Sequence, residues 1–233
     1  MAVFGHYRTT PLNPDVRNGW FIGQMIYDGW VWMIPLEPDL ISIGVVVTLD
    51  EYRAAKQGPR DFLEHYIRTM PVLQEGIASD PQLEGDVHLY GNLGYTTTRA
   101  HGPGWVLVGD AAFFIDPCYS SGVHLALTTA REASRAFLES RATGGRQAVA
   151  FEEYEQHLRR DERLMLRFVD SFYMASRNRV LKWLVPATLT DSLNRSFVSV
   201  TAGEFAKRPY MINGTYYISK LVSSVFFPFR AAV

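Results

Sequence analysis

The chain has 233 residues, with 23 lysine and arginine residues against 24 aspartate and glutamate residues, so its formal net charge is −1. Hydrophobic residues make up 47% and charged residues 20%, a composition that excludes intrinsic disorder. The near-neutral charge provides no long-range field for nucleic acid, which we exclude as a partner.

The first third of the chain predicts an antiparallel sheet. Residues 20–27 and 30–36 are rich in aromatic and aliphatic side chains and flank Asp28-Gly29, a dipeptide that favours a tight hairpin turn. Residues 40–47 form a third, β-branched run. A three-stranded meander is the simplest interpretation, and its apolar character on both sides predicts that both faces are covered.

The middle of the chain changes periodicity. Residues 59–70 have helical spacing, residues 87–98 look extended, and residues 105–108 predict a short buried strand that leads into Gly109-Asp110. Beyond Pro117 the apolar residues recur at steps of three or four, which predicts a helix.

The last third predicts helices. Residues 151–179 form a long amphipathic stretch, and the remainder reads as helix interrupted at Pro186, Pro209 and Pro228. Strands first and helices last indicate an α+β fold. We divide the chain into residues 1–85, with the sheet and a helix, residues 86–140, with the embedded strand and helix, and residues 141–233, a helical region.

The segment 104–130 carries the clearest chemical signal. Asp110 follows the predicted strand at its carboxyl end, where ligands of α/β sheets bind. Ser120, Ser121 and Gly122 directly precede a helix, whose free backbone N–H groups and positive dipole end attract anions. The alternative is purely structural, with Asp110 and Ser120 acting only as caps.

This segment resembles the second flavin-binding motif of FAD enzymes with the para-hydroxybenzoate hydroxylase type of fold, and most closely that of the flavin-dependent halogenases. Trp30, Trp32 and Pro35 match the Trp-x-Trp-x-Ile-Pro signature of the same halogenases. The resemblance extends over about residues 20–135. It implies an α+β chain made of a substrate-side antiparallel sheet, the second half of an FAD-binding α/β domain and C-terminal helices.

The resemblance implies that FAD, and a chloride or bromide ion, bind at a set of six residues: Gly109, Asp110, Pro117, Ser120, Ser121 and Gly122. Asp110 would accept a hydrogen bond from a ribityl hydroxyl, and Pro117 would line the edge of the isoalloxazine. The backbone amides around Ser121 and Gly122 would face the flavin pyrimidine and the halide. We predict no metal site.

The resemblance assigns Trp30, Trp32 and Pro35 to the catalytic region. The two tryptophans lie two positions apart on a predicted strand, so both indoles point to one face and could separate the flavin from the organic substrate. Ordinary packing of aromatic side chains on a sheet is the alternative.

The implied activity is chlorination or bromination of an electron-rich aromatic molecule of the phenol or pyrrole type, either free or tethered to a carrier protein, in natural-product (antibiotic) biosynthesis. A flavin reductase would supply reduced FAD. Three alternatives remain: an FAD-dependent monooxygenase, a relative of the polyprenyl reductases, and a non-catalytic remnant or partner subunit.

The glycine fingerprint that holds the FAD pyrophosphate in this family is missing from the sequence. We therefore expect an N-terminally incomplete halogenase with weak FAD affinity, whose fingerprint segment could lie on a separate chain. The start of the chain lacks the blocks of a signal peptide, its one cysteine forms no internal disulfide, and no run reaches the roughly 20 apolar residues of a membrane span. We expect a cytoplasmic protein.

Three further residues near the motif have modest expectations. His124 and Asp116 are expected to be structural, as a hydrogen-bonding residue at the helix start and as the residue that fixes a turn. Cys118 is expected to fill space as a small buried side chain or to be a reactive thiol without function.

Overall fold

The computed structural model describes residues 1–78, 80–142 and 147–177. The chain divides into two compact units, Met1–Leu93 and Gly94–Val233, and each is described by itself. The fold is α+β, as predicted from the sequence. The predicted helix breaks at Pro186, Pro209 and Pro228 lie outside the described residues.

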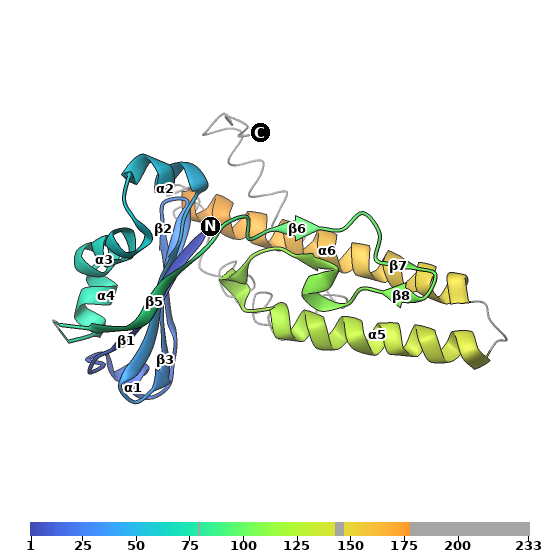
Figure 1. Ribbon diagram of the computed structural model, residues 1–233, viewed down its shortest axis with the longest axis horizontal. Coiled ribbons are helices and arrows are strands. Elements are labelled where there is room, and N and C mark those ends of the chain that lie inside the picture. The colour runs from blue at the N-terminus through green and yellow to red at the C-terminus, as the bar shows by residue number, and fades with distance from the viewer. Residues whose placement is uncertain (79, 143–146, 178–233) are drawn as a thin grey trace, which may run out of the picture. The chain divides into compact units, whose positions relative to one another are not determined.

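The first unit is built on a five-stranded antiparallel sheet with the strand order β2-β3-β4-β1-β5 (Figure 1). The predicted meander is present as β2, β3 and β4. Two further strands extend it beyond β4, and the sequence interpretation missed the first of them. The strands are β1 (Ala2–Arg8), β2 (Ile22–Ile26), β3 (Gly29–Glu37), β4 (Leu40–Val46) and β5 (Gln82–Tyr90).

The hairpin between β2 and β3 turns one residue earlier than predicted. Ile26 pairs with Gly29, so Tyr27 and Asp28 form the loop, and Asp28 has φ +60°. Gly29 is instead the first residue of β3. A Cβ at this position would lie 2.0 Å from the carbonyl oxygen of Val46. The glycine is therefore needed for close strand approach rather than for the turn.

Helices cover one face of this sheet (Figure 1). Alternate residues of the strands, such as Val31 and Met33, form one buried cluster with Phe62 and Leu63. The helix over residues 59–70 is confirmed, with Pro59 at its first position and its apolar face on the sheet. The helices of this unit are α1 (Pro14–Arg17), α2 (Leu49–Ala55), α3 (Pro59–Thr69) and α4 (Pro71–Gly76).

The second unit combines short strands with two long helices. Its elements are β6 (Tyr95–Thr96), β7 (His101–Gly102), β8 (Trp105–Val106), the 3-10 turn η1 (Gly109–Ala111), β9 (Phe113–Phe114), the 3-10 turn η2 (Pro117–Tyr119), α5 (Gly122–Ala142) and α6 (Gln147–Arg177).

Two strand predictions around this unit were too long. The extended run 87–98 is interrupted after Tyr90, where Asn92 takes φ +50°. The predicted buried strand 105–108 is regular only over Trp105–Val106, and Trp105 is 44% exposed. Beyond this strand, the Leu107 N–H donates to the carbonyl of Ala100, and the Leu107 carbonyl accepts a hydrogen bond from the Tyr154 hydroxyl. The backbone hydrogen bonds of Leu107 therefore do not continue the β-ladder.

Helices α5 and α6 lie side by side (Figure 1). The small residues Ala133 and Ala136 of α5 are buried in one cluster with the aromatic residues Phe151 and Tyr154 of α6. Glu155 of α6 binds three groups at once. Its carboxylate accepts the Ala100 N–H at 3.1 Å, lies 3.4 Å from His101 Nε2 and pairs with Arg159 at 3.1 Å. Arg159 also pairs with the buried Glu162 at 2.9 Å. Through Glu155, this network holds residues 100–101 in contact with α6.

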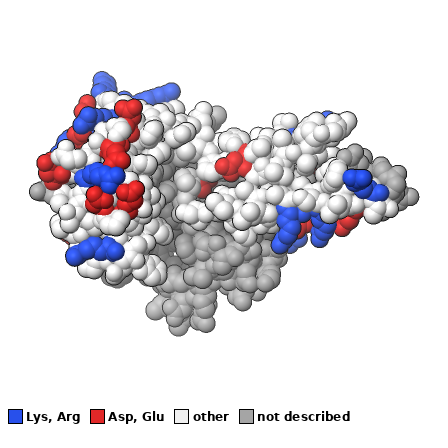
Figure 2. Space-filling view, turned by 60° about the horizontal axis from the view of Figure 1, so that its bottom comes forward, with Lys and Arg blue, Asp and Glu red and all other residues white. Residues whose placement is uncertain are grey.

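Charges of both signs are interspersed on the visible face of the first unit (Figure 2). Within this unit, Arg8 pairs with Glu84, with Asp39 at 2.9 Å and with Glu37 at 3.2 Å. That face therefore carries no single-sign patch of the kind that attracts a polyelectrolyte.

Candidate functional site

A tight turn at Gly109 begins the candidate site in the second unit. Gly109 has φ +54°, and its N–H donates to the buried Thr129 hydroxyl of α5 at 2.8 Å. A Cβ at Gly109 would lie 3.0 Å from the Cβ of Ala126. Glycine is required here for two reasons, the left-handed backbone and the close approach of η1 to α5.

Asp110 follows at the surface, next to the start of α5. Its Oδ1 lies 3.9 Å from the position that a Cβ of Gly122 would occupy. The Asp110 backbone carbonyl accepts the Tyr95 hydroxyl, which fixes the main chain behind the carboxylate. The structure therefore brings together the acid and the helix start that the sequence interpretation places at one ligand.

The turn η2 leads the chain from the acid to the helix. Asp116 accepts the Cys118 N–H at 2.8 Å through Oδ1 and the Tyr173 hydroxyl at 2.9 Å through Oδ2. Ser120 then takes φ +51° and donates its N–H to the Pro117 carbonyl at 2.9 Å. Asp116 therefore fixes the turn, as expected from the sequence.

The N-terminus of α5 presents backbone donors. The helical hydrogen bonds of α5 begin with the Leu125 N–H, which donates to the Ser121 carbonyl at 2.9 Å. The amides of Gly122 and Val123, in the first turn, are therefore not used within the helix. Ser121 is 8% exposed, whereas Ser120 is exposed and Pro117 is half-buried. The amides of Gly122 and Val123 lie at the positive end of the helix dipole, so they can bind an anion or a ring with hydrogen-bond acceptors.

His124 and Cys118 stay outside this set. His124 Nε2 lies 3.4 Å from the Thr128 hydroxyl of the same helix, which fits the structural role expected for it. Burial, with a smaller contribution from Asp116, raises the pKa of the Cys118 thiol well above its usual value. The thiol therefore stays protonated and a poor nucleophile.

The tryptophans of the signature lie on β3 in the first unit. Trp30 and Trp32 are 9% and 8% exposed, and their ring centroids are 5.3 Å apart. Both occupy the sheet face opposite the one that α3 covers, because the buried Val31 and Met33 alternate with them. The Trp32 indole N–H donates to the buried Ser42 hydroxyl at 3.2 Å.

Pro35 lies on the face of β3 opposite the two tryptophans, and its assignment to the catalytic region stays a prediction. The β3–β4 register is continuous through Pro35, which pairs with Ile41. Strand alternation therefore puts Pro35 on the same face as Met33, away from Trp32. The register shifts directly after it, between Pro35 and Glu37, so the proline marks the irregular end of the strand pairing.

Sequence reasoning missed the aromatic neighbours of Trp32. Phe4 of β1 lies 5.8 Å from Trp32 between ring centroids, and Phe4 in turn lies 5.1 Å from His88 and 5.9 Å from Tyr90 of β5. Gly44 of β4 makes room for this cluster, because a Cβ there would lie 2.2 Å from Trp32. The alternating run of residues 2–8 was the one signal that could have indicated the missing strand.

Metal-binding clusters and membrane-spanning helices were sought among the described residues. These residues contain no group of three or more histidine, cysteine, aspartate or glutamate side chains that could hold a metal ion. In the part of the chain that the structure covers, none of the helices combines the length and the apolarity needed to cross a bilayer.

Comparisons with known proteins agree with these motifs. The tryptophan halogenase family matches residues 25–202 of the chain. The flavin-dependent halogenase ptaM of Pestalotiopsis fici is 36% identical over 110 residues, which are 46% of this chain and 20% of ptaM. The 1H-pyrrole-2-carbonyl-peptidyl-carrier-protein chlorinase of Pseudomonas fluorescens is 29% identical over 144 residues, 62% of this chain and 32% of the chlorinase.

Among solved structures, the myxobacterial chondrochloren halogenase CndH matches with a TM-score of 0.66 and 28% identity, over 87% of this chain and 48% of that one. This chain therefore spans about a fifth to a third of the length of the curated relatives given above, and about half of the solved relative. The resemblance drawn from the sequence motifs is confirmed at the level of the family.

Proposed function

The chain belongs to the tryptophan halogenase family, and from that premise we propose that it takes part in FAD-dependent chlorination or bromination of an electron-rich aromatic substrate. One observation of this structure carries the proposal, the position of the Asp110 carboxylate beside Gly122 at the N-terminus of α5. The exposed carboxylate can accept hydrogen bonds from the hydroxyl groups of a ribityl chain. The backbone N–H groups beside it can donate to the flavin pyrimidine or to a halide ion.

The residues present fit FAD at this place. The Asp110 side chain is exposed and is positioned by its own main chain, so its oxygens can accept hydrogen bonds from ribityl hydroxyls. Gly122 leaves the helix start open, because Asp110 is the one side chain among the described residues within 4 Å of the place where its Cβ would be. Ser121 and Gly122 would direct amides to the flavin or a halide, while Gly109, Pro117 and Ser120 would shape the loop around it.

When bound, reduced FAD supplies the electrons that activate oxygen for halide oxidation. The chain's own contribution is to bind and orient the cofactor through Asp110 and the amides of α5, and to hold a halide where a helix dipole favours negative charge. We assign Trp30 and Trp32 the role of excluding the organic substrate from the flavin, so that the substrate is halogenated rather than hydroxylated. Their rigid mutual packing and the Ser42 hydrogen bond support that role.

We further propose a carrier-tethered or free aromatic substrate of the phenol or pyrrole type, in natural-product biosynthesis in the cytoplasm. A separate flavin reductase would supply reduced FAD. The relative from Pseudomonas fluorescens, by its name, chlorinates a pyrrole on a peptidyl carrier protein, and this supports the carrier-tethered form. The family match favours the halogenase over the monooxygenase and polyprenyl reductase alternatives.

The proposal predicts bromination. We would supply the chain with reduced FAD, oxygen, bromide and resorcinol as the aromatic probe, with and without the N-terminal FAD segment of a homologous halogenase. Mass spectrometry should find bromoresorcinol, and Trp32→Ala should raise the ratio of hydroxylated to brominated product by roughly tenfold or more, about 1.4 kcal/mol in relative barriers. Hydroxylated product alone from the unmodified chain would refute the assignment. Tyr27→Ala, which removes an exposed aromatic residue from the neighbouring loop, serves as the control.

A further inference from the structure

Strand β2 forms one edge of the sheet in the first unit. Among the described residues, β3 is the one strand that pairs with it. Residues 20–27, which include β2, contain no charged side chain and no proline. Phe21 and Tyr27, one at each end of the strand, are 62% and 74% exposed. Native proteins commonly protect a sheet edge with charges, proline or a bulge, so this edge is open to pairing with another strand.

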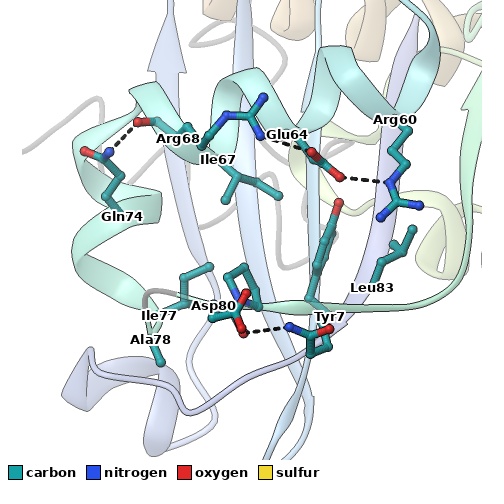
Figure 3. A pocket seen from close by; sticks show the side chains of 12 residues that line it. Tyr7, Arg60, Glu64, Ile67, Arg68, Gln74, Ile77, Ala78, Asp80 and Leu83 are labelled. Atoms are coloured by element: carbon teal, nitrogen blue, oxygen red, sulfur yellow. Dashed lines mark hydrogen bonds and ion pairs between the residues drawn. The ribbon is translucent and has the colours of Figure 1, made fainter.

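The opposite edge strand, β5, carries the protection that β2 lacks. The register between β5 and β1 shifts once, and Gly85 takes φ +76°. Glu84 and Asp86 are exposed on the same strand. The start of β5 lies at a pocket whose walls carry charged residues such as Arg60 and Asp80 (Figure 3). An irregular register and these charges oppose strand pairing at β5, which leaves β2 as the edge that can accept a strand.

The backbone groups of β2 alternate between its neighbour and the free edge. Ile26 and Gly29 flank the two-residue loop of the hairpin and pair with each other, so they exchange hydrogen bonds between β2 and β3. Every second residue back along β2 from Ile26 bonds to β3 in the same way. Gly23 and Met25 therefore direct their N–H and C=O groups away from β3, to the free edge.

The sequence of this edge is nearly palindromic about Gln24. Residues 21–27 read Phe-Ile-Gly-Gln-Met-Ile-Tyr, with an isoleucine and then an aromatic residue near each end. Two antiparallel copies of β2 that meet about a twofold axis at Gln24 place Gly23 of one copy opposite Met25 of the other. These are the residues whose backbone groups point to the free edge, so this register also forms the hydrogen bonds between the strands.

The side chains are complementary in the same register. Ile22 of one copy lies opposite Ile26 of the other, and both residues already pack against the buried cluster of their own sheet. Directly beyond the strand, Phe21 lies opposite Tyr27. Cross-strand pairs of aliphatic and of aromatic residues stabilise antiparallel strands, and a strand without charges brings no like charges together.

We propose that β2 binds a second copy of this chain, with the two β2 strands antiparallel and Gln24 on the twofold axis. The contact uses the same surface of both copies and joins their two sheets into one continuous sheet. It is independent of the proposed halogenation, because it uses neither Trp30 and Trp32 nor the residues from Gly109 to Gly122.

A charge exchange at Gln24 tests the proposal, because the axis places the two Gln24 side chains directly opposite each other. Association of the 233-residue chain is measured by analytical ultracentrifugation at low ionic strength, and the unmodified chain should show a reversible monomer–dimer equilibrium. Gln24→Lys and Gln24→Glu should each weaken dimerisation about fivefold, because like charges then meet at the axis. An equimolar mixture of the two variants should associate about tenfold more tightly than either variant alone.

Gln82→Lys and Gln82→Glu are the matched controls. Gln82 is an exposed glutamine on the opposite edge strand, β5, as Gln24 is on β2. The Gln82 variants should dimerise like the unmodified chain, and mixing them should not strengthen association. The proposal would be overturned by a chain that stays monomeric up to about 100 µM. A dimer that the Gln24 variants leave unchanged, or that the Gln82 variants weaken instead, would overturn it as well.

Discussion

Replacing Gly44 with alanine is expected to displace the Trp32 indole and to lower the free energy of unfolding by about 3 kcal/mol, at the upper end of the cost of overpacking a core. Gly44 pairs with Trp32 on one side and with Phe4 on the other. A Cβ at this position would lie 2.2 Å from Trp32 Cζ2 and 2.6 Å from Phe4 Cβ. Trp32 cannot move easily, because it is buried and its indole N–H donates to Ser42.

Gly23→Ala is the matched control for this substitution. Gly23 of β2 is the other strand partner of Trp32, yet the nearest contact of a Cβ there is Phe21, at an ordinary 3.4 Å. Urea unfolding gives the stability of both variants, and near-ultraviolet circular dichroism reports the packing of the tryptophans. Gly44→Ala should change both measurements and Gly23→Ala neither by much. Equal losses in the two variants would show that Gly44 does not shape the tryptophan face.

The Gly109→Ala substitution should cost about 3 kcal/mol of stability and weaken flavin binding. A side chain at φ +54° costs about 1–2 kcal/mol, and overpacking typically adds about 1–3 kcal/mol. The added Cβ would lie 3.0 Å from Ala126 Cβ and 3.1 Å from Ala126 Cα, so η1 would have to move away from α5. That movement would carry Asp110 away from Gly122.

Gly104→Ala separates the two contributions. Gly104 also has a positive φ, +80°, but a Cβ there would meet no atom within 4 Å in the part of the chain that the structure describes. It should therefore lose only the conformational part, about 1 kcal/mol, and retain flavin affinity. Thermal unfolding followed by circular dichroism, together with flavin fluorescence, measures both effects. If Gly109→Ala behaved like Gly104→Ala in both assays, the contact between η1 and α5 would have no role in positioning Asp110.

Much of the first sheet could be predicted because its signals are local. The β-branched run of β4 and the turn residue Asp28 lie within the hairpins that they specify. The central position of β1 could not be predicted, because it depends on pairing with residues about 40 and about 80 positions away. The same distance in sequence hid the contact of Phe4 with Trp32.

The candidate flavin site was predictable for a related reason. Gly109, Asp110 and Gly122 lie on one short segment, and a tight turn followed by a helix start brings them together without help from distant strands.

The central claim is that Asp110 and the start of α5 bind the flavin, and a flavin titration tests it most directly. The 233-residue chain is titrated with oxidised FAD, and flavin fluorescence is followed for the unmodified chain, for Asp110→Asn and for the charge-matched Asp61→Asn in the first unit. We predict saturable binding, weakened roughly 10- to 100-fold by Asp110→Asn, as for a lost hydrogen bond to a charged group, and unchanged by Asp61→Asn. Absence of saturable binding, or Asp110→Asn binding FAD as tightly as the unmodified chain, would contradict the claim.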